Sequence, residues 1–258
     1  MTTTQRPPAH PALVVVAVLF VAVVVGVGAT ELFSHVVSRT VETSTVHRPT
    51  GDRFTVDSET GDVTVVPSTD GQVHVHTVVR HGIGTPDLVE ESTPSGVRLD
   101  ADCDDFGTSD CSVAYTVELP PAFALTVSGA HGDVTARGLT GPVRVDRSTG
   151  DIALFDVTGP VDVTSRAGEI TALGLRGDTV QARSDTGDVR LELLEPPRSV
   201  VVGTEFGEVD VALPAGAAYR VSAWTRFGDR SVTVPVDPFS DRAVTIDGGT
   251  GDVRLHTT

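Results

Sequence analysis

Short runs in which apolar and polar residues alternate recur through the second half of the chain. Val143–Val145, Val161–Val163 and Val209–Val211 each place a charged residue between two valines. Alternation with a period of two puts the valines on one face of a strand and the charge on the other. Many short strands with one apolar face predict an all-β fold.

A glycine followed by an acidic residue punctuates these runs seven times. The pairs follow one another at intervals of 18, 18, 19, 20, 21 and 23 residues. A repeat of about 20 residues is typical of solenoids. Glycine permits the positive φ of a tight corner, and the acidic side chain after it can bond nearby amides. The pairs are Gly132-Asp133, Gly150-Asp151, Gly168-Glu169, Gly187-Asp188, Gly207-Glu208, Gly228-Asp229 and Gly251-Asp252.

Further glycines at Gly141, Gly159 and Gly177 divide the repeat into halves of nine residues. Nine residues accommodate one short strand and one turn, so each coil should contain two strands and two corners. The pattern predicts a β-solenoid of about 18–23 residues per coil. Its coils should stack about 4.8 Å apart, and inward Val, Leu and Ile should form one continuous core.

The first half of the chain carries the same signal more faintly. Gly51, Gly61 and Gly71 are ten residues apart, which predicts opening coils over residues 50–80. Residues 81–112 interrupt the rhythm with Gly, Pro, Asp and Ser, and we expect a hairpin or loop insertion there. The solenoid domain is therefore expected to span residues 49–258.

Residues 12–30 form an uncharged run of mostly Val, Ala and Leu. As a helix, this run would be about 28 Å long and would match the hydrocarbon thickness of a bilayer. We expect a transmembrane helix at residues 12–30, between a cytoplasmic tail at residues 1–11 and a stalk at residues 31–48. The alternative is a signal peptide cleaved after Ala29, although the run is longer than a usual signal sequence. In both cases the rest of the chain is extracytoplasmic, and in the first it belongs to a single-pass protein of the cell membrane.

Two cysteines, Cys103 and Cys111, lie close together within the irregular segment. In an oxidising compartment such a pair favours a disulfide, whereas two buried free thiols do not suit so polar a stretch. Closing this small ring should constrain the segment by about 2–3 kcal/mol.

The overall charge narrows the range of partners. The formal net charge is −16 and the sequence pI is near 4.7, which argues against a nucleic-acid partner. The chain contains neither Lys nor Asn. This composition excludes a Walker lysine, a Schiff-base lysine, a Ser-x-x-Lys nucleophile and an N-glycosylation sequon.

Three segments of the sequence carry a family resemblance. Val113–Pro121 leads into Ser128–Ala136, and Ser148–Leu154 repeats the rhythm of glycine, aspartate and an apolar residue. With these segments the chain resembles a bacterial adhesin-like family of otherwise unknown function, over residues 50–258. The resemblance implies a membrane-anchored or exported β-solenoid, and it brings no catalytic motif with it.

The acidic residues of the repeat are expected to stack along one edge of the solenoid. Carboxylates about 5 Å apart repel by about 1 kcal/mol in water. Arg147, Arg166 and Arg226 lie two or three residues before their glycines, so we expect them to interleave with the acids. Bound divalent cations are a second way to relieve the repulsion. The simplest interpretation is that the corners are hydrated and each acidic side chain caps its turn.

Acidic residues also cluster around the two cysteines. An EF-hand loop needs Gly at its sixth position and Glu at its twelfth, where this chain has Asp105 and Cys111. We expect a solvated acidic loop and no cofactor, with calcium as the alternative. The candidate calcium ligands are Asp100, Asp102, Asp104, Asp105 and Asp110.

Histidines offer a second set of candidate metal ligands. His74 and His76 lie two residues apart on one face of a strand, with His81 nearby. Val73 and Val75 should face the core, so we expect the histidines to face water.

Two further features of the sequence lie at glycines of the repeat, namely a tripeptide and a pair of phenylalanines. Arg176–Asp178 matches an integrin-binding tripeptide, but the repeat already requires its Gly-Asp half. Phe206 and Phe227 each precede a repeat glycine, and adjacent coils should stack them in a core ladder. Trp224 and Tyr219 are close in sequence, which leaves an exposed aromatic patch as the alternative.

Motifs for catalysis are missing from the sequence, which lacks Gly-x-Ser-x-Gly, His-Glu-x-x-His and Cys-x-x-Cys. We expect a non-enzymatic adhesion, scaffold or interaction role at the bacterial cell surface, with a protein or cell-wall glycan as partner. The alternatives are a cell-wall carbohydrate-binding or carbohydrate-active protein, and an accessory of an envelope-stress sensor. The sequence ends just after the last repeat, so we expect an open C-terminal coil that is either shielded locally or used for self-association or partner docking.

Overall fold

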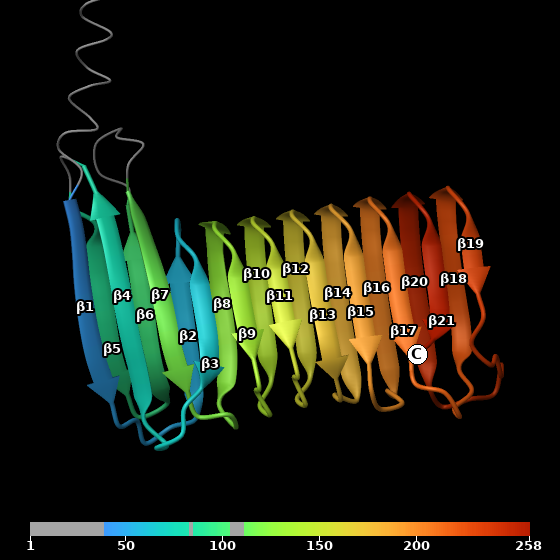
Figure 1. Cartoon of the computed structure of the whole chain (residues 1–258), viewed down its shortest axis with the longest axis horizontal. Helices are drawn as coiled ribbons and strands as arrows, with labels where there is room; N and C mark the ends of the chain where they lie inside the picture. The colour runs from blue at the N-terminus through green and yellow to red at the C-terminus, as the bar shows by residue number, and fades with distance from the viewer. Residues whose placement is uncertain (1–38, 83–84, 104–110) are drawn as a thin grey trace, which may run out of the picture.

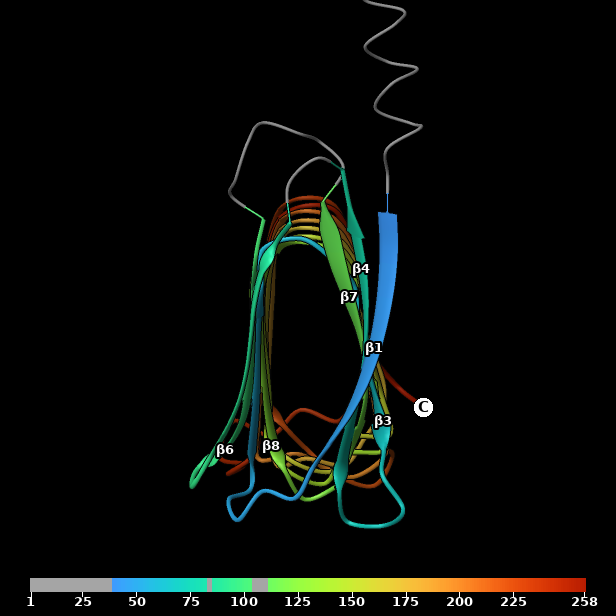
Figure 2. The same ribbon diagram turned by 90° about the vertical axis from the view of Figure 1, so that its left-hand side faces the viewer.

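A computed structural model describes residues 39–82, 85–103 and 111–258 of the chain. These residues form only strands and their connections, arranged as two long sheets that face each other across a flat core (Figures 1 and 2). From β8 to β21 every paired strand is parallel to its neighbours. The predicted all-β fold is confirmed, and the structure adds that the strands of these coils are parallel.

The first sheet, which we call sheet A, contains eleven of the described strands. In spatial order they are β1 (Arg39–His47), β4 (Val73–His81), β7 (Ser112–Leu119), β3 (Val63–Pro67), β9 (Val134–Arg137), β11 (Ile152–Phe155), β13 (Ile170–Leu175), β15 (Val189–Leu193), β17 (Val209–Leu213), β21 (Val253–Thr257) and β19 (Arg230–Val232).

The second sheet, sheet B, contains ten of the described strands. In spatial order they are β18 (Arg220–Phe227), β20 (Ala243–Thr250), β16 (Ser199–Phe206), β14 (Thr179–Thr186), β12 (Val161–Ala167), β10 (Val143–Thr149), β8 (Ala124–His131), β2 (Arg53–Ser58), β6 (Gly96–Asp102) and β5 (Asp87–Thr93).

The chain winds from one sheet to the other and back in each coil. In sheet B, Val143 pairs with Leu125 on one side and with Val161 on the other, a step of 18 residues in each direction. Equivalent positions of successive coils are therefore stacked. Because every second residue of a strand points inward, stacking aligns the apolar residues in columns between the two sheets.

These columns form a core with almost no exposed surface. Val134, Ile152, Ile170 and Val189 lie in one column of sheet A, and each is at most 1% exposed. Burying such a side chain stabilises the fold by about 1.5–3 kcal/mol. A single coil has no neighbour to cover this surface, so the stability of the fold depends on stacking.

The repeat glycines lie where successive coils touch most closely. Gly150 has a φ of +132°, and a Cβ atom on it would lie 2.2 Å from the carbonyl oxygen of Gly132 in the neighbouring coil. A side chain cannot occupy that space unless the two coils separate. The glycines recur at this corner because backbone stacks directly on backbone there.

The order of the coils in space differs from their order in the sequence at both ends. β20 lies between β16 and β18, and β21 lies between β17 and β19. β2 is inserted between β6 and β8 in the same way. The C-terminal coil is therefore paired on both sides, and among the described strands the open edge at this end belongs to β18 and β19. The expectation that the C-terminal coil is the open end is wrong, because the chain turns back to fill a gap of one coil.

The other end of the stack is closed by antiparallel strands. β1 pairs with β4, and the hairpin of β5 and β6 covers the end of sheet B. Residues 39–47 of the expected stalk thus belong to sheet A, because their β-branched side chains suit a strand and β4 offers a free edge. Thr45 and His47 of β1 both contact the carboxylate of Glu90 in β5. These contacts join the two sheets across the end of the core.

The predicted disulfide between Cys103 and Cys111 is confirmed, with the two Cα atoms 5.9 Å apart. It ties the end of β6 to the start of β7.

The expected transmembrane helix at residues 12–30 lies outside the described residues, as does the expected tail at residues 1–11. Over residues 39–82, 85–103 and 111–258 we find no helix with the length and hydropathy to span a bilayer.

Replacing Gly150 by Ala should destabilise the fold by about 3 kcal/mol or more, because the new Cβ meets a backbone oxygen that is held by its own coil. Thermal unfolding of the full chain measures this loss. Gly216→Ala is the matched control, since Gly216 also has a positive φ of +90° but its Cβ would meet nothing within 4 Å. That variant should lose only about 1 kcal/mol. Equal losses in the two variants would mean that backbone strain, and not coil contact, accounts for the repeated glycines.

Candidate functional site

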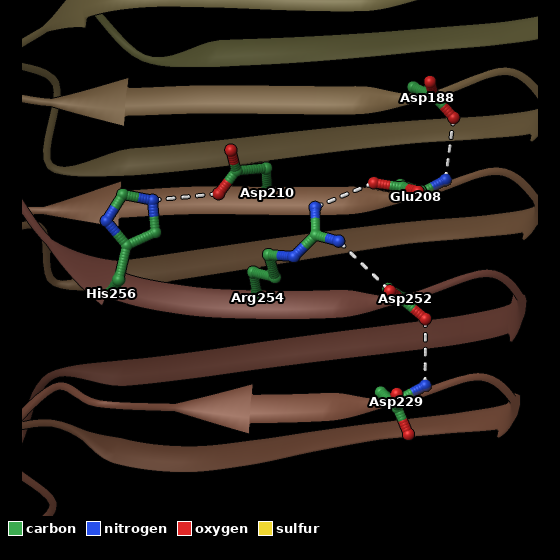
Figure 3. Close-up of polar contacts among 7 residues, drawn as sticks. All are labelled: Asp188, Glu208, Asp210, Asp229, Asp252, Arg254 and His256. Carbon is green, nitrogen blue, oxygen red and sulfur yellow. Dashed lines mark hydrogen bonds and ion pairs between the residues drawn. The ribbon is translucent and has the colours of Figure 1, made fainter.

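The acidic side chains of the repeat run along the corner at which the chain passes from sheet B to sheet A. Asp133 Oδ1 accepts a hydrogen bond of 2.9 Å from the backbone N–H of Asp151, and Asp151 Oδ1 accepts one of 2.8 Å from Glu169. Each aspartate thus caps the corner of the neighbouring coil, and the amide dipole offsets part of the repulsion between carboxylates. The same bond joins Asp62 to Asp133. Figure 3 shows two further examples, from Asp188 to Glu208 and from Asp252 to Asp229.

At Glu208, an arginine adds further hydrogen bonds to the row of acidic corner residues. Arg254 on β21 donates one hydrogen bond of 2.8 Å to Glu208 and another of 3.1 Å to Asp252 (Figure 3). The hydrogen bond to Glu208 and its charge raise the pKa of Arg254 above its usual value. The expected interleaving by Arg166 and Arg226 is not observed, because neither forms an ion pair with a described residue. The arginine that crosses the row comes from a strand of sheet A instead.

Arg147 reaches the acidic corner from inside the core, and not from between the exposed acids as expected. Its side chain is fully buried, and Nη1 and Nη2 donate to the carbonyl oxygens of Ser58 and Gly61 at 2.8 and 3.3 Å. Gly129 on the neighbouring strand leaves room for it, since a Cβ there would lie 2.3 Å from Nη1. Burial lowers the pKa of Arg147, because the charged form loses its hydration. The alternation of β10 already places this position on the inner face.

The described residues do not gather the calcium candidates into a site. Asp100 lies on β6 and accepts a hydrogen bond of 2.8 Å from Arg98, and Asp102 ends the same strand. Asp104, Asp105 and Asp110 lie outside the described residues. Within the described ranges, no three His, Cys, Asp or Glu side chains are arranged to hold a metal ion.

His74 and His76 on β4 point away from the core, and the valines that alternate with them are buried. His74 Nε2 lies 3.0 Å from Asp70 Oδ2, and His76 Nδ1 lies 3.0 Å from Ser44 Oγ. His81 bonds the carbonyl oxygen of the next residue at 3.2 Å. Each ring is therefore engaged by a different local partner, and the three do not converge.

The tripeptide Arg176–Asp178 forms the corner between β13 and β14. Arg176 Nη1 lies 3.3 Å from the carbonyl oxygen of Gly174 and 3.8 Å from Asp156 Oδ1. The arginine thus contacts its own coil and the neighbouring one, which is a structural use of this side chain.

The aromatic residues near the C-terminus do not form the expected core ladder. Phe206 and Phe227 both pair with Thr250, whose strand lies between theirs, and they are 58% and 67% exposed. The prediction of a core ladder is wrong, because β20 separates the strands of the two rings and both rings point outward at the corner. Tyr219 is fully buried, whereas Trp224 is 44% exposed. An exposed aromatic patch therefore exists, without Tyr219.

A groove of about 530 Å³ lies on the outer face of sheet B, over β14, β16, β20 and β18. The strands are in register, so outward residues form rows across the groove. Four strands about 4.8 Å apart make each row about 14 Å long. The two central rows are Arg183, Gly203, Asp247 and Trp224, and then Asp185, Glu205, Gly249 and Arg226.

The charged side chains of the groove have no partners among the described residues. Arg183 and Arg226 present hydrogen-bond donors, and Asp185, Glu205 and Asp247 present acceptors. On the same face further along the stack, β10 and β12 are joined by an ion pair of 2.6 Å. Unpaired donors and acceptors around a hollow are available to a ligand that offers both.

Gly203 accounts for the hollow in the middle of the groove. A glycine inside a strand weakens the sheet and often marks a place where a ligand approaches closely. At Gly249 a Cβ would lie 2.2 Å from the carbonyl oxygen of Glu205, so packing requires that glycine. At Gly203 a Cβ would lie 3.3 Å from the carbonyl oxygen of Asp247, which a small shift relieves. Packing therefore does not require glycine at position 203, and the main effect of the missing side chain is the hollow on the outer surface.

No family model matches the sequence, and no curated protein matches it. Two solved structures are similar to the chain in fold. One is a "putative cell adhesion protein" from Clostridium sporogenes, with 11% identity and a TM-score of 0.37, covering 85% of this chain and 100% of that one. The other is a "putative adhesin" from Bacteroides fragilis, with 13% identity and a TM-score of 0.40, covering 84% of this chain and 97% of that one. At these identities and TM-scores the likeness carries no argument about this chain.

Hydrogen bonds lower the pKa of Asp70 from 3.8 to about 2, and the largest cause is the backbone N–H of Gln72 at 2.9 Å. Because the pKa is lower in the folded than in the unfolded state, the resulting stabilisation is present above about pH 4 and is lost as the pH falls through about 2. An NMR titration of the full chain should find the Asp70 midpoint near pH 2. Asp70→Asn should remove this part of the acid dependence of the melting temperature. A midpoint near 3.8 would contradict the assignment.

Proposed function

We propose that the chain is a non-enzymatic adhesion protein of the bacterial cell surface, in which a membrane-anchored solenoid carries a binding groove. The observation that supports this most directly is the groove on sheet B, with its unpaired charges and exposed tryptophan. Concave surfaces with a few convergent polar groups are the usual places at which proteins hold a ligand.

The position of the groove along the stack supports this proposal. β1 lies at one end, and the four strands of the groove lie toward the other (Figure 1). Sheet A contains eleven described strands, so the stack is about 48 Å long. A chain anchored through residues 12–30 then uses its coils as a spacer between β1 and the groove.

The stack is also suited to transmit force from a ligand to an anchor. Each strand between the two ends is hydrogen-bonded to a strand on both sides, and one core runs through all the coils. Separating two coils requires breaking two strand pairings and exposing apolar side chains on both sheets. A spacer built in this way is stiff along its length.

Binding suits the groove better than catalysis does. It lies on an open sheet face, and its three carboxylates, Asp185, Glu205 and Asp247, are exposed to solvent. Enzymes commonly close their sites against water, which strengthens the electrostatic effects on which catalysis depends. Nothing in the described residues favours the alternative of an envelope-sensor accessory.

The anchor is tested by fractionating cells that express the full chain. If residues 12–30 are retained, the chain should stay in the membrane pellet after carbonate extraction, and its N-terminus should be that of the printed sequence. Protease added outside intact cells should digest the solenoid but spare residues 1–11. A soluble chain that begins after Ala29 would show instead that this segment is a cleaved signal peptide.

Adhesion is tested by comparing cells with and without the full chain for attachment to other cells and to glycan- or protein-coated surfaces. Cells with the chain should attach more. Gly203→Leu fills the groove and should reduce attachment about tenfold, the change that corresponds to roughly 1.4 kcal/mol.

The matched control for this variant is Val46→Leu on β1, an exposed apolar position at the other end of the stack. It should leave attachment unchanged. Melting temperatures of both variants confirm that the fold is intact. The proposal fails if cells that display a folded Gly203→Leu chain attach as well as those with the original chain.

A further inference from the structure

We propose that the groove on sheet B binds a neutral polysaccharide, with a pyranose ring stacked on Trp224. This inference rests on the proposed function and adds the chemical class of the ligand. It follows from three features of the groove, namely an aromatic platform, unpaired charges of both signs and central strands, β14, β16 and β20, that are paired on both sides.

Trp224 supplies an apolar platform beside the charged side chains of the groove, and Phe206 is a second exposed aromatic residue in the lining. The side chain is 44% exposed and ends the row that begins with Arg183. A pyranose ring has an apolar face of C–H groups and a rim of hydroxyls, so it can pack on an indole while its rim bonds to polar side chains. Gly203 and Asp247, between the ends of this row, leave the space that such a ring needs.

The polar groups of the groove match hydroxyls better than ions. Asp185, Glu205 and Asp247 accept hydrogen bonds, and Arg183 and Arg226 donate them. A sugar hydroxyl both donates and accepts, so an uncharged sugar can satisfy groups of both signs. An anionic polymer would meet three carboxylates on a chain whose formal net charge is −16. A cationic ligand would meet two guanidinium groups.

A peptide fits the groove less well. Extended peptides commonly bind by adding a strand to an open sheet edge. β14, β16 and β20 are each paired on both sides, so the centre of the groove has no free backbone groups. A ligand there must be held by side chains, as a sugar is.

Trp224 is the only tryptophan of the chain, so its fluorescence reports directly on the groove. The full chain in detergent micelles is titrated with soluble gluco-, manno-, galacto- and chito-oligosaccharides, with oligouronates, and with mixed peptides. At least one neutral oligosaccharide should give a saturable change that salt does not suppress. Gly203→Leu keeps the reporter but fills the groove, and it should weaken binding by at least about tenfold.

Calorimetry with the same oligosaccharide tests the stacking itself. Trp224→Ala should weaken binding by about tenfold or more, and Trp224→Phe should restore part of the loss because a smaller ring remains. Phe239→Ala is the matched control, since Phe239 is 92% exposed and lies outside the groove. It should leave the affinity unchanged.

The outcomes separate this inference from the proposed function. Binding of oligouronates alone, or of peptides alone, would overturn the neutral polysaccharide. The absence of any saccharide binding would also overturn it, but would leave the proposed function in place if Gly203→Leu still abolishes cell attachment. Attachment that does not depend on the groove would contradict the proposed function itself.

Discussion

The contact on which the rest of the structure depends is the one between the backbones of successive coils at the glycine-acid corner. The carbonyl oxygen of Gly132 lies where a side chain on Gly150 would be, so the two coils can approach to strand spacing only if glycine is present. That approach brings the aspartate of one coil within reach of the amide of the next. It also aligns the two sheets, and the inward Val, Leu and Ile then stack on one another.

The same constraint explains where a binding site can exist. Corner glycines and inward aliphatic residues are committed to stacking, but outward side chains are free to vary because no layer covers them. On the outer face of sheet B, the outward residues near the C-terminal end differ from those further along the stack. Gly203 omits a side chain that packing would tolerate, and Trp224 and unpaired charges surround the resulting hollow. The scaffold supplies rigidity, and the outer rows form the groove that we propose as the binding site.

Much of the fold could be predicted from residue pattern, whereas the placement of several side chains could not. The all-β architecture and the disulfide of Cys103 and Cys111 follow from local signals. The side chain of Arg147 differs from the expectation because strand alternation, and not its charge, sets its direction and points it inward. Phe206 and Phe227 differ from the expectation because their repeats are neighbours in sequence but are separated in space by β20. The groove has only two sequence signals, the mid-strand Gly203 and the single tryptophan.

The sequence by itself determined the coil, because strand alternation, corner glycines and their spacing are local properties that each repeat carries. Only the tertiary structure decided the order of the coils, since every coil presents nearly the same edge of backbone donors and acceptors to the next. The C-terminal strands β20 and β21 could pair with any such edge, and they lie between β16 and β18 and between β17 and β19. That insertion places Asp247 and Gly249 of β20 between the outward residues of β16 and those of β18. The groove therefore exists because strand pairing is non-local, and no repeat read alone contains it.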